Sequence, residues 1–182
     1  MKKVFIILVA IAINIVALHG QKIVTIGNDM TNSVVYPFTT YYEDGRTQIL
    51  YTFDEILMSG LIEEIGFNVS DNNSYTMNGF TIKMGLTTNN TLTSLYTNST
   101  EVVYEGDYSV SATGWQMIQL QTPFYYDGSS NLIIEICYDN DDYDYYSYVY
   151  ASEMSNRTMT DYDDGNHGCS MTSLYQESYR PN

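Results

Sequence analysis

Two short stretches near the end of the chain concentrate the aspartates. These residues are Asp139, Asp141, Asp142 and Asp144 in the first stretch and Asp161, Asp163 and Asp164 in the second. Carboxylate oxygens are the ligands that Ca²⁺ prefers, and the ion takes six to eight oxygens. The sequence therefore predicts a calcium site at which the two acidic loops converge. The alternative is a solvated acidic surface that keeps the protein soluble, and the spacing from Asp139 does not match an EF-hand loop.

Tyrosine is the second unusual feature, with 19 residues in the chain. Tyr146, Tyr148 and Tyr150 alternate along one predicted strand, so they should share one of its faces. Tyr125 and Tyr126 lie together in a predicted loop. Tyrosine rings offer flat apolar faces with polar tips, which suit contact with sugars or with a protein partner. These five residues are the candidate ligand-binding set. The alternative is that tyrosine packs half-buried because it favours strands.

No catalytic motif stands out in the sequence. There is no phosphate-binding loop, no zinc-ligand spacing and no serine nucleophile elbow. Glu55, Glu63 and Glu64 are the carboxylates that lie near predicted strands, and a glycoside hydrolase needs two carboxylates at a set separation. Glu63 and Glu64 are adjacent, so they should face opposite sides of a strand. We therefore expect a non-catalytic protein, and a hydrolase is the less favoured interpretation.

The chain contains two cysteines, Cys137 and Cys169. A disulfide between them would close a loop of about 32 residues, which stabilises a fold by roughly 3–4 kcal/mol in the chain-entropy model. Two separate thiols are the alternative. A cysteine nucleophile paired with His167 is not expected, because nothing in the glycine-rich loop around His167 would position it.

The first 20 residues are typical of an export signal. Lys2 and Lys3 precede an almost wholly apolar run at 4–17, and Gly20 offers a small residue for cleavage. Residues 21–182 are then expected to form a single domain. An exported protein reaches an oxidising compartment, which favours the disulfide. Secretion or display at the cell surface is therefore the expected destination.

The charge of the chain excludes several classes of partner. There are 22 acidic and 7 basic residues, and the formal net charge is −15. Binding to nucleic acid requires clustered Lys and Arg that replace the counterions of phosphate, and attraction to anionic lipid requires the same residues. No apolar run after residue 20 is long enough to span a bilayer. We expect neither a nucleic-acid partner nor a membrane span after removal of the signal.

The elements that position these side chains are predicted to be strands, because apolar residues alternate with a period of two. The expected strands are 22–26, 34–41, 48–52, 62–69, 79–86, 102–108, 115–120, 131–138, 145–151 and 157–162, with a last one beginning near Ser178. One helical turn is expected at 52–57, and Trp115 is expected in the core. The pattern predicts an all-β protein, namely an antiparallel, jelly-roll-like β-sandwich of about ten strands.

A longer motif overlaps these strands. It consists of Gly114-Trp115, Ile118-Gln119-Leu120, Thr122-Pro123-Phe124, Tyr126-Asp127-Gly128 and Ser130-Asn131-Leu132. Pro37-Phe38 and Tyr41-Tyr42 before it, and Tyr179-Arg180-Pro181-Asn182 after it, fit the same pattern. The chain resembles the β-sandwich modules of secreted and surface proteins of Bacteroidota, many of which carry fibronectin type III repeats and type IX secretion sorting tails. It is similar, more distantly, to the cleaved-adhesin jelly rolls.

The resemblance implies a non-catalytic adhesive or ligand-binding module, and it supplies no functional residues to transfer. Family members continue past the matching Arg-Pro-Asn into one more strand and often a sorting tail. This sequence departs from the family by ending at Asn182. The last strand of the domain is therefore expected to be shortened or missing.

The sequence thus predicts a secreted or cell-surface β-sandwich module for adhesion or glycan binding, without catalysis. Its partner would be a glycan or a surface protein, and Ca²⁺ is the one cofactor that the residues suggest. The alternative is a structural subunit or spacer of a surface assembly, in which another chain supplies a strand. An exposed tyrosine face would favour the binding module, and an unpaired sheet edge would favour the assembly subunit.

Overall fold

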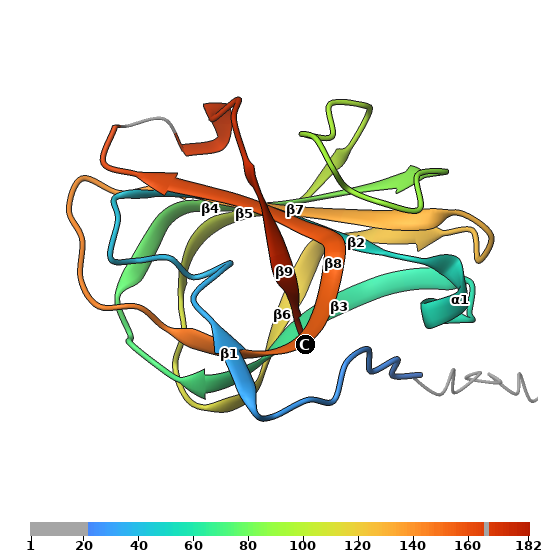
Figure 1. The fold of residues 1–182 in the computed structure, drawn as a ribbon, viewed down its shortest axis with the longest axis horizontal. Helices are drawn as coiled ribbons and strands as arrows, with labels where there is room; N and C mark the ends of the chain where they lie inside the picture. Colours follow the sequence, from blue (N-terminus) through green and yellow to red (C-terminus); the bar gives the residue numbers. More distant parts are fainter. Residues whose placement is uncertain (1–21, 166–167) are drawn as a thin grey trace, which may run out of the picture.

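Nine antiparallel strands, one helical turn and one 3₁₀ turn form the regular structure of the described residues (Figure 1). The computed structural model describes residues 22–165 and 168–182, so the expected export signal at 1–20 and His167 lie outside it. The elements are β1 (Asn32–Val34), β2 (Asp44–Tyr51), α1 (Phe53–Ile56), β3 (Gly60–Asp71), β4 (Thr76–Thr87), β5 (Glu101–Ser109), β6 (Gly114–Tyr126), β7 (Asn131–Asp139), β8 (Tyr148–Asp163), η1 (Gly168–Ser170) and β9 (Tyr175–Pro181). Within these residues no helix has the length and apolar character needed to cross a membrane.

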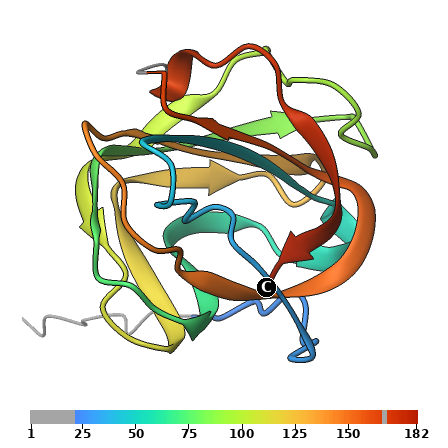
Figure 2. The same cartoon turned by 60° about the vertical axis from the view of Figure 1, so that its left-hand side comes forward.

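The strands form one continuous sheet that curls around an apolar core (Figure 2). The strand order is β5-β4-β7-β2-β8-β3-β6, and β1 and β9 both pair with β8. The predicted all-β antiparallel class is confirmed. The sheet is nearly closed, because its two outermost strands, β5 and β6, come back into contact.

A bend in β8 allows the sheet to change direction, so that one strand takes part in two regions of the sheet (Figure 1). Its first residues, up to Ala151, pair with β1 and β3, whereas its last residues, from Thr158, pair with β2. The pairing with β9 shifts register between Glu153 and Thr158. Asn156 lies in this interval with a φ of 62°, a conformation that asparagine tolerates better than most residues. One strand therefore replaces the two that were expected at 145–151 and 157–162.

A single side chain bridges the seam between β5 and β6. The amide nitrogen of Gln121 donates to the carbonyl oxygen of Glu105 (2.8 Å), and the Glu105 backbone N–H donates to the Gln121 side-chain oxygen (3.1 Å). The side chain thus makes the two bonds that a neighbouring backbone would make. This satisfies part of the β5 edge, which an unpaired strand would otherwise offer to another chain.

The core has two parts, one on each side of the central strands. Inside the curled sheet, Phe38, Phe67 and Phe80 pack with the apolar residues of most strands. The outer side of β2 and β7 is covered by a smaller cluster, which consists of Leu50, Leu92, Tyr96, Ile133, Met159, Met171 and Leu174. Segments 88–100 and 168–174, green and red at the top of Figure 1, supply the cover. As a result β7 is buried along both faces.

Three sequence expectations about the strands are corrected. Segment 22–26 is not a strand, and the side chain of Ile23 is exposed. The strand expected at 34–41 is reduced to the short β1, because the chain turns at the Tyr36–Pro37 peptide and enters a loop. Trp115 is 46% exposed on β6 rather than in the core, because the inward positions of β6 belong to the alternate residues Ile118, Leu120 and Phe124. The described residues therefore contain nine strands rather than about ten.

The structure joins Cys137 of β7 to Cys169 of η1 in a disulfide. Cys137 is fully buried on the outer side of the sheet. The bond therefore fastens the segment that carries η1 over the smaller apolar cluster. Its role here is to hold a covering loop in place.

Candidate functional site

Six tyrosines in mutual ring contact form the most distinctive surface of the molecule. This tyrosine cluster consists of Tyr41, Tyr42, Tyr143, Tyr146, Tyr148 and Tyr162. The ring centroids of Tyr42 and Tyr162 lie 4.6 Å apart, and those of Tyr41 and Tyr146 lie 5.2 Å apart. Such distances are those of attractive aromatic pairs. The rings come from the β1–β2 loop, the β7–β8 loop and both ends of β8.

One buried threonine side chain and two backbone hydrogen bonds tie the two loops together and so hold the cluster. The Thr40 hydroxyl donates to the carbonyl oxygen of Tyr145 (2.6 Å), and the Asp144 N–H donates to the carbonyl oxygen of Thr40 (2.8 Å). The Asn140 N–H donates to the carbonyl oxygen of Glu43 (2.8 Å). Backbone groups of distant loops are thereby fixed against each other (both loops lie at the left of Figure 1). The tyrosines are presented on a preorganised surface rather than on free loops.

The cluster combines exposed ring faces with buried anchors. Tyr41 and Tyr143 are 46% and 54% exposed, whereas Tyr42, Tyr146 and Tyr162 are partly buried. Burial, together with the neighbouring tyrosines, raises the pKa of Tyr146 to about 12. Its hydroxyl is therefore neutral at physiological pH and available as a hydrogen-bond donor.

The remaining tyrosines of the candidate set lie elsewhere. Tyr125 is exposed on β6, where it pairs with Leu61 of β3. Tyr126 is buried in the core, and its hydroxyl donates to the carbonyl oxygen of Ser130 (2.6 Å); this burial removes it from the candidate ligand-binding set. Tyr150 is half-buried beside β1. The structure thus brings Tyr146 and Tyr148 together as expected and adds four partners to them.

Part of the first acidic stretch borders the tyrosine cluster. Asp141 and Asp142 are exposed in the same loop as Tyr143. Through its Oδ1, Asp142 accepts the Tyr143 N–H (2.9 Å), and Asp144 accepts the Tyr145 N–H in the same way (2.8 Å). These bonds fix the orientation of both carboxylates within the loop that carries Tyr143 and Tyr146.

The second acidic stretch lies at the end of β8. Asp163 pairs with Asp44, which in turn pairs with Asp139, so three aspartates stand side by side on neighbouring strands. Asp161 accepts the Tyr162 N–H (2.9 Å), and Asp164 accepts the Glu43 N–H (3.3 Å). In the described chain, no three His, Cys, Asp or Glu side chains form a group that could hold a metal ion. The calcium site stays a prediction from the sequence.

Of the carboxylates considered for hydrolysis, Glu55 is bound by structural partners. Glu55 accepts both the backbone N–H and the hydroxyl of Thr52 (2.9 Å each), so it caps α1. It also binds Arg180 with both oxygens, at 2.8 and 3.0 Å. Glu63 is exposed and Glu64 is partly buried on β3. Glu55 is thus a structural residue that fastens β9 to α1.

This pairing predicts a loss of stability in acid. Burial alone would raise the pKa of Glu55, but the hydrogen bonds from Arg180 and Thr52 outweigh burial and lower it from 4.5 to about 2. A lowered pKa stabilises the fold above the unfolded-state value, and the contribution is lost as the pH falls from about 4.5 through 2. We expect a loss on the order of 3 kcal/mol from this group. Urea unfolding between pH 6 and 2 measures it, and the curve of Glu55→Gln should be flatter by that amount; identical slopes would contradict the assignment.

A buried ionic network on the outer side of the sheet was not anticipated. Lys83, Glu135 and Gln48 stand opposite one another on β4, β7 and β2. Glu135 binds the Arg46 guanidinium (2.7 Å), the Lys83 ammonium (2.9 Å) and the Gln48 amide (2.5 Å). These interactions lower the pKa of Glu135 although burial opposes the shift. The signal in the sequence was a single charged residue inside the apolar run 131–138.

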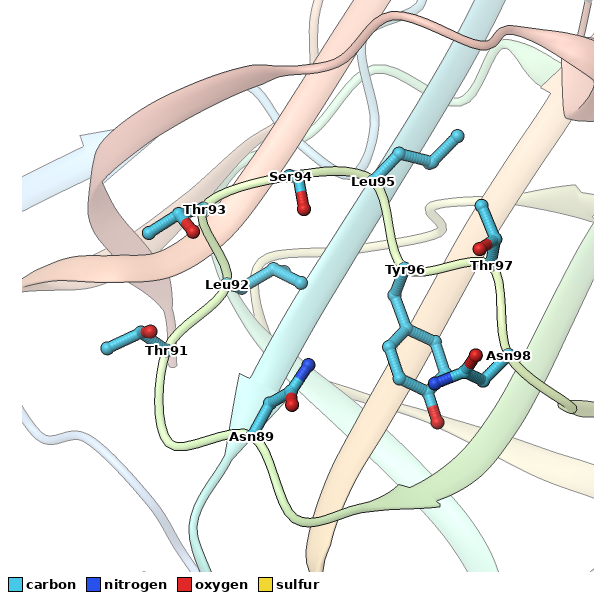
Figure 3. A pocket seen from close by; sticks show the side chains of 9 residues that line it. All are labelled: Asn89, Thr91, Leu92, Thr93, Ser94, Leu95, Tyr96, Thr97 and Asn98. Atoms are coloured by element: carbon cyan, nitrogen blue, oxygen red, sulfur yellow. The ribbon is translucent and has the colours of Figure 1, made fainter.

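The segment that follows β4 encloses a hollow of about 230 Å³ (Figure 3). Its lining residues are Asn89, Thr91, Leu92, Thr93, Ser94, Leu95, Tyr96, Thr97 and Asn98. Gln48 fixes the segment from below, because its side chain bonds both the N–H (2.8 Å) and the carbonyl oxygen (2.9 Å) of Tyr96. The lining offers hydroxyl and amide groups but no charged side chain. The tyrosine cluster, with carboxylates beside exposed rings, is the stronger candidate for a binding site.

No family model, curated protein or solved structure matches this chain. The resemblance to surface modules of Bacteroidota stays a prediction from the motif. The function must be argued from the side chains themselves.

Proposed function

We propose that this chain is a non-catalytic binding module of the secreted or cell-surface class, and that it binds a glycan on the tyrosine cluster. The observation that carries the proposal is a set of six contacting tyrosines, in part exposed, on loops held by buried hydrogen bonds. Aromatic faces stack on the apolar faces of sugar rings. The tyrosine hydroxyls and the carboxylates of the same loop supply hydrogen-bond partners for sugar hydroxyls.

Preorganisation supports the proposal further. A ligand that binds to flexible loops loses part of the interaction energy to ordering them. Here Thr40 and Asn140 are buried and already bonded to the loop opposite. The rings of Tyr41 and Tyr146 are in contact before any ligand arrives. A ligand therefore needs to order these loops very little when it binds.

A glycan array followed by titration calorimetry tests the proposal. Wild type should bind at least one class of glycan, and the double substitution Tyr41→Ala/Tyr143→Ala should weaken binding about tenfold, the loss expected for two ring contacts. Tyr175→Ala is the matched control, because Tyr175 is 68% exposed but lies on β9 outside the cluster. The array is run with Ca²⁺ and with EDTA, because the acidic loops are the predicted calcium ligands. Equal weakening by the control would place binding elsewhere.

A second candidate function is supported by the outer face of β3 and β6. Leu61 and Tyr125 are exposed as a pair at one end of these strands, and Trp115 and Met117 are exposed on β6 toward the other end. Exposed apolar side chains that gather into a patch are typical of protein–protein contact. A structural subunit of a surface assembly would cover this face. If the protein is such a subunit, sedimentation velocity should show oligomers and the glycan array should show no binding.

A further inference from the structure

The charges of the protein leave the tyrosine cluster in a negative field. Among the described residues the basic side chains are Lys22, Arg46, Lys83, Arg157 and Arg180. Arg46 and Lys83 pair with Glu135, and Arg180 pairs with Glu55. Three of the five cations are therefore used inside the fold, whereas nearly all of the aspartates remain at the surface. A ligand that approaches the molecule meets mostly carboxylates.

The carboxylates nearest to the cluster lie on the two loops that carry it. Asp141 and Asp142 flank Tyr143, and Glu43 follows Tyr42. Tyr75 lies next to this group: burial raises its pKa, and the charges of Asp142, Asp144, Glu43 and Asp141 raise it further. The exposed ring of Tyr143 and the exposed carboxylates of Asp141 and Asp142 thus lie in one loop.

A ring face next to carboxylates is the arrangement that attracts ammonium groups. The cation is drawn to the negative face of the ring, and the carboxylates add direct attraction that salt screens. The same field repels uronic acids, sulfated sugars and sialic acids. A neutral sugar would gain from stacking but not from the charge.

We propose that the glycan bound by the tyrosine cluster carries free, protonated amino groups. This inference rests on the proposed binding function and specifies its ligand class. The sugar rings lie on the exposed faces of Tyr41 and Tyr143, and the ammonium groups lie toward Asp141 and Asp142. The carboxylates give selectivity for the glycan with protonated amino groups. The rings supply the stacking energy that charged and neutral glycans have in common.

Two oligosaccharides with one backbone separate the two contributions. The probes are a hexamer of β-1,4-linked glucosamine and its fully N-acetylated counterpart, titrated into wild type by calorimetry at pH 6 and low salt. We expect the amine form to bind at least tenfold more tightly. The preference should shrink in 0.5 M NaCl and at a pH at which the amines are neutral. Equal affinity for the two hexamers would overturn the inference and leave the proposed function standing. If neither hexamer bound, the inference would also be overturned, and the glycan array would then test the proposed function on its own.

Substitutions place the effect on named residues. Asp141→Asn/Asp142→Asn should remove most of the preference for the amine form and leave the affinity for the N-acetylated hexamer unchanged. Tyr41→Ala/Tyr143→Ala should weaken both. Glu101→Gln, at an exposed position on β5, is the control for general attraction to polycations. A loss of preference in the control as large as in the aspartate variant would overturn the inference. Polylysine that binds as tightly as the amine hexamer, with the same sensitivity to the variants, would also overturn it in favour of a cationic polypeptide.

Discussion

Glu135→Ala is expected to lower the free energy of unfolding by about 3–5 kcal/mol, the cost of removing one partner from a buried ion pair. The side chain of Glu135 is 3% exposed and accepts bonds from Arg46, Lys83 and Gln48. Without it, two cations and an amide keep their buried positions but lose their acceptor. Gln48 also holds Tyr96, and Arg46 donates to the carbonyl oxygen of Met171. Both covering segments should therefore loosen.

Urea unfolding followed by circular dichroism, with the disulfide intact, measures this loss. Glu63→Ala is the control, because Glu63 is exposed on β3 and surface substitutions usually change stability by less than about 0.5 kcal/mol. Hydrogen exchange should show faster exchange in residues 88–100 of the Glu135 variant. A loss below about 1 kcal/mol would mean that solvent reaches the network, contrary to its burial.

Arg180→Met is expected to cost about 3 kcal/mol, because it leaves Glu55 without its counter-ion in a partly buried site. Arg180 is 2% exposed. Its guanidinium binds both oxygens of Glu55 and lies 4.7 Å from the ring centroid of Tyr51. The paired hydrogen bonds need the planar guanidinium, and the ring contact needs a cation. The substitution keeps an unbranched apolar stem and removes the guanidinium, and with it also the bond to the carbonyl oxygen of Leu50 (3.4 Å).

Thermal and urea unfolding of Arg180→Met and Arg180→Lys measure the effect. The lysine variant should recover part of the loss, since it keeps the charge but not the paired hydrogen bonds. In the methionine variant the pKa of Glu55 should return toward its ordinary value, so that the acid-sensitive part of stability disappears. Wild-type pH dependence in that variant would show that the Arg180 bonds do not lower this pKa.

The sequence is enough to predict the class of the fold, but not the covering of β7 on both faces or the bend within β8. Period-two alternation specifies strands on its own, because one face of each strand is buried. It cannot show that β7 is buried on both faces, because the cover comes from segments 88–100 and 168–174, far away in the chain. Nor can it show that β8 continues through Ser155 and Asn156, where polar residues suggest a turn. The strand is held by its pairing before and after this interval, with β9 up to Glu153 and with β2 and β9 from Thr158.

For a similar reason, only part of the candidate site could be predicted from the sequence. Tyr146 and Tyr148 are close in sequence, so alternation could place them together. Tyr41 and Tyr162 join them only because the sheet order brings their segments to one end of the molecule. Tyr126 was misjudged although a local signal existed. Adjacent residues on a strand face opposite sides, so Tyr125 and Tyr126 could not both be exposed.

The sheet order also governs how the chain can reach this fold. Among its hydrogen-bonded pairs, only β4–β5 and β8–β9 join strands that follow one another in sequence. β2 pairs with β7 and β8, and β3 pairs with β6 and β8, across most of the chain. Loops must close before such contacts stabilise anything, and β proteins of this kind fold in milliseconds to seconds. During synthesis, which starts at the N-terminus, β2 therefore has no strand to pair with until β7 has been made. The sheet can assemble only when the chain is nearly complete.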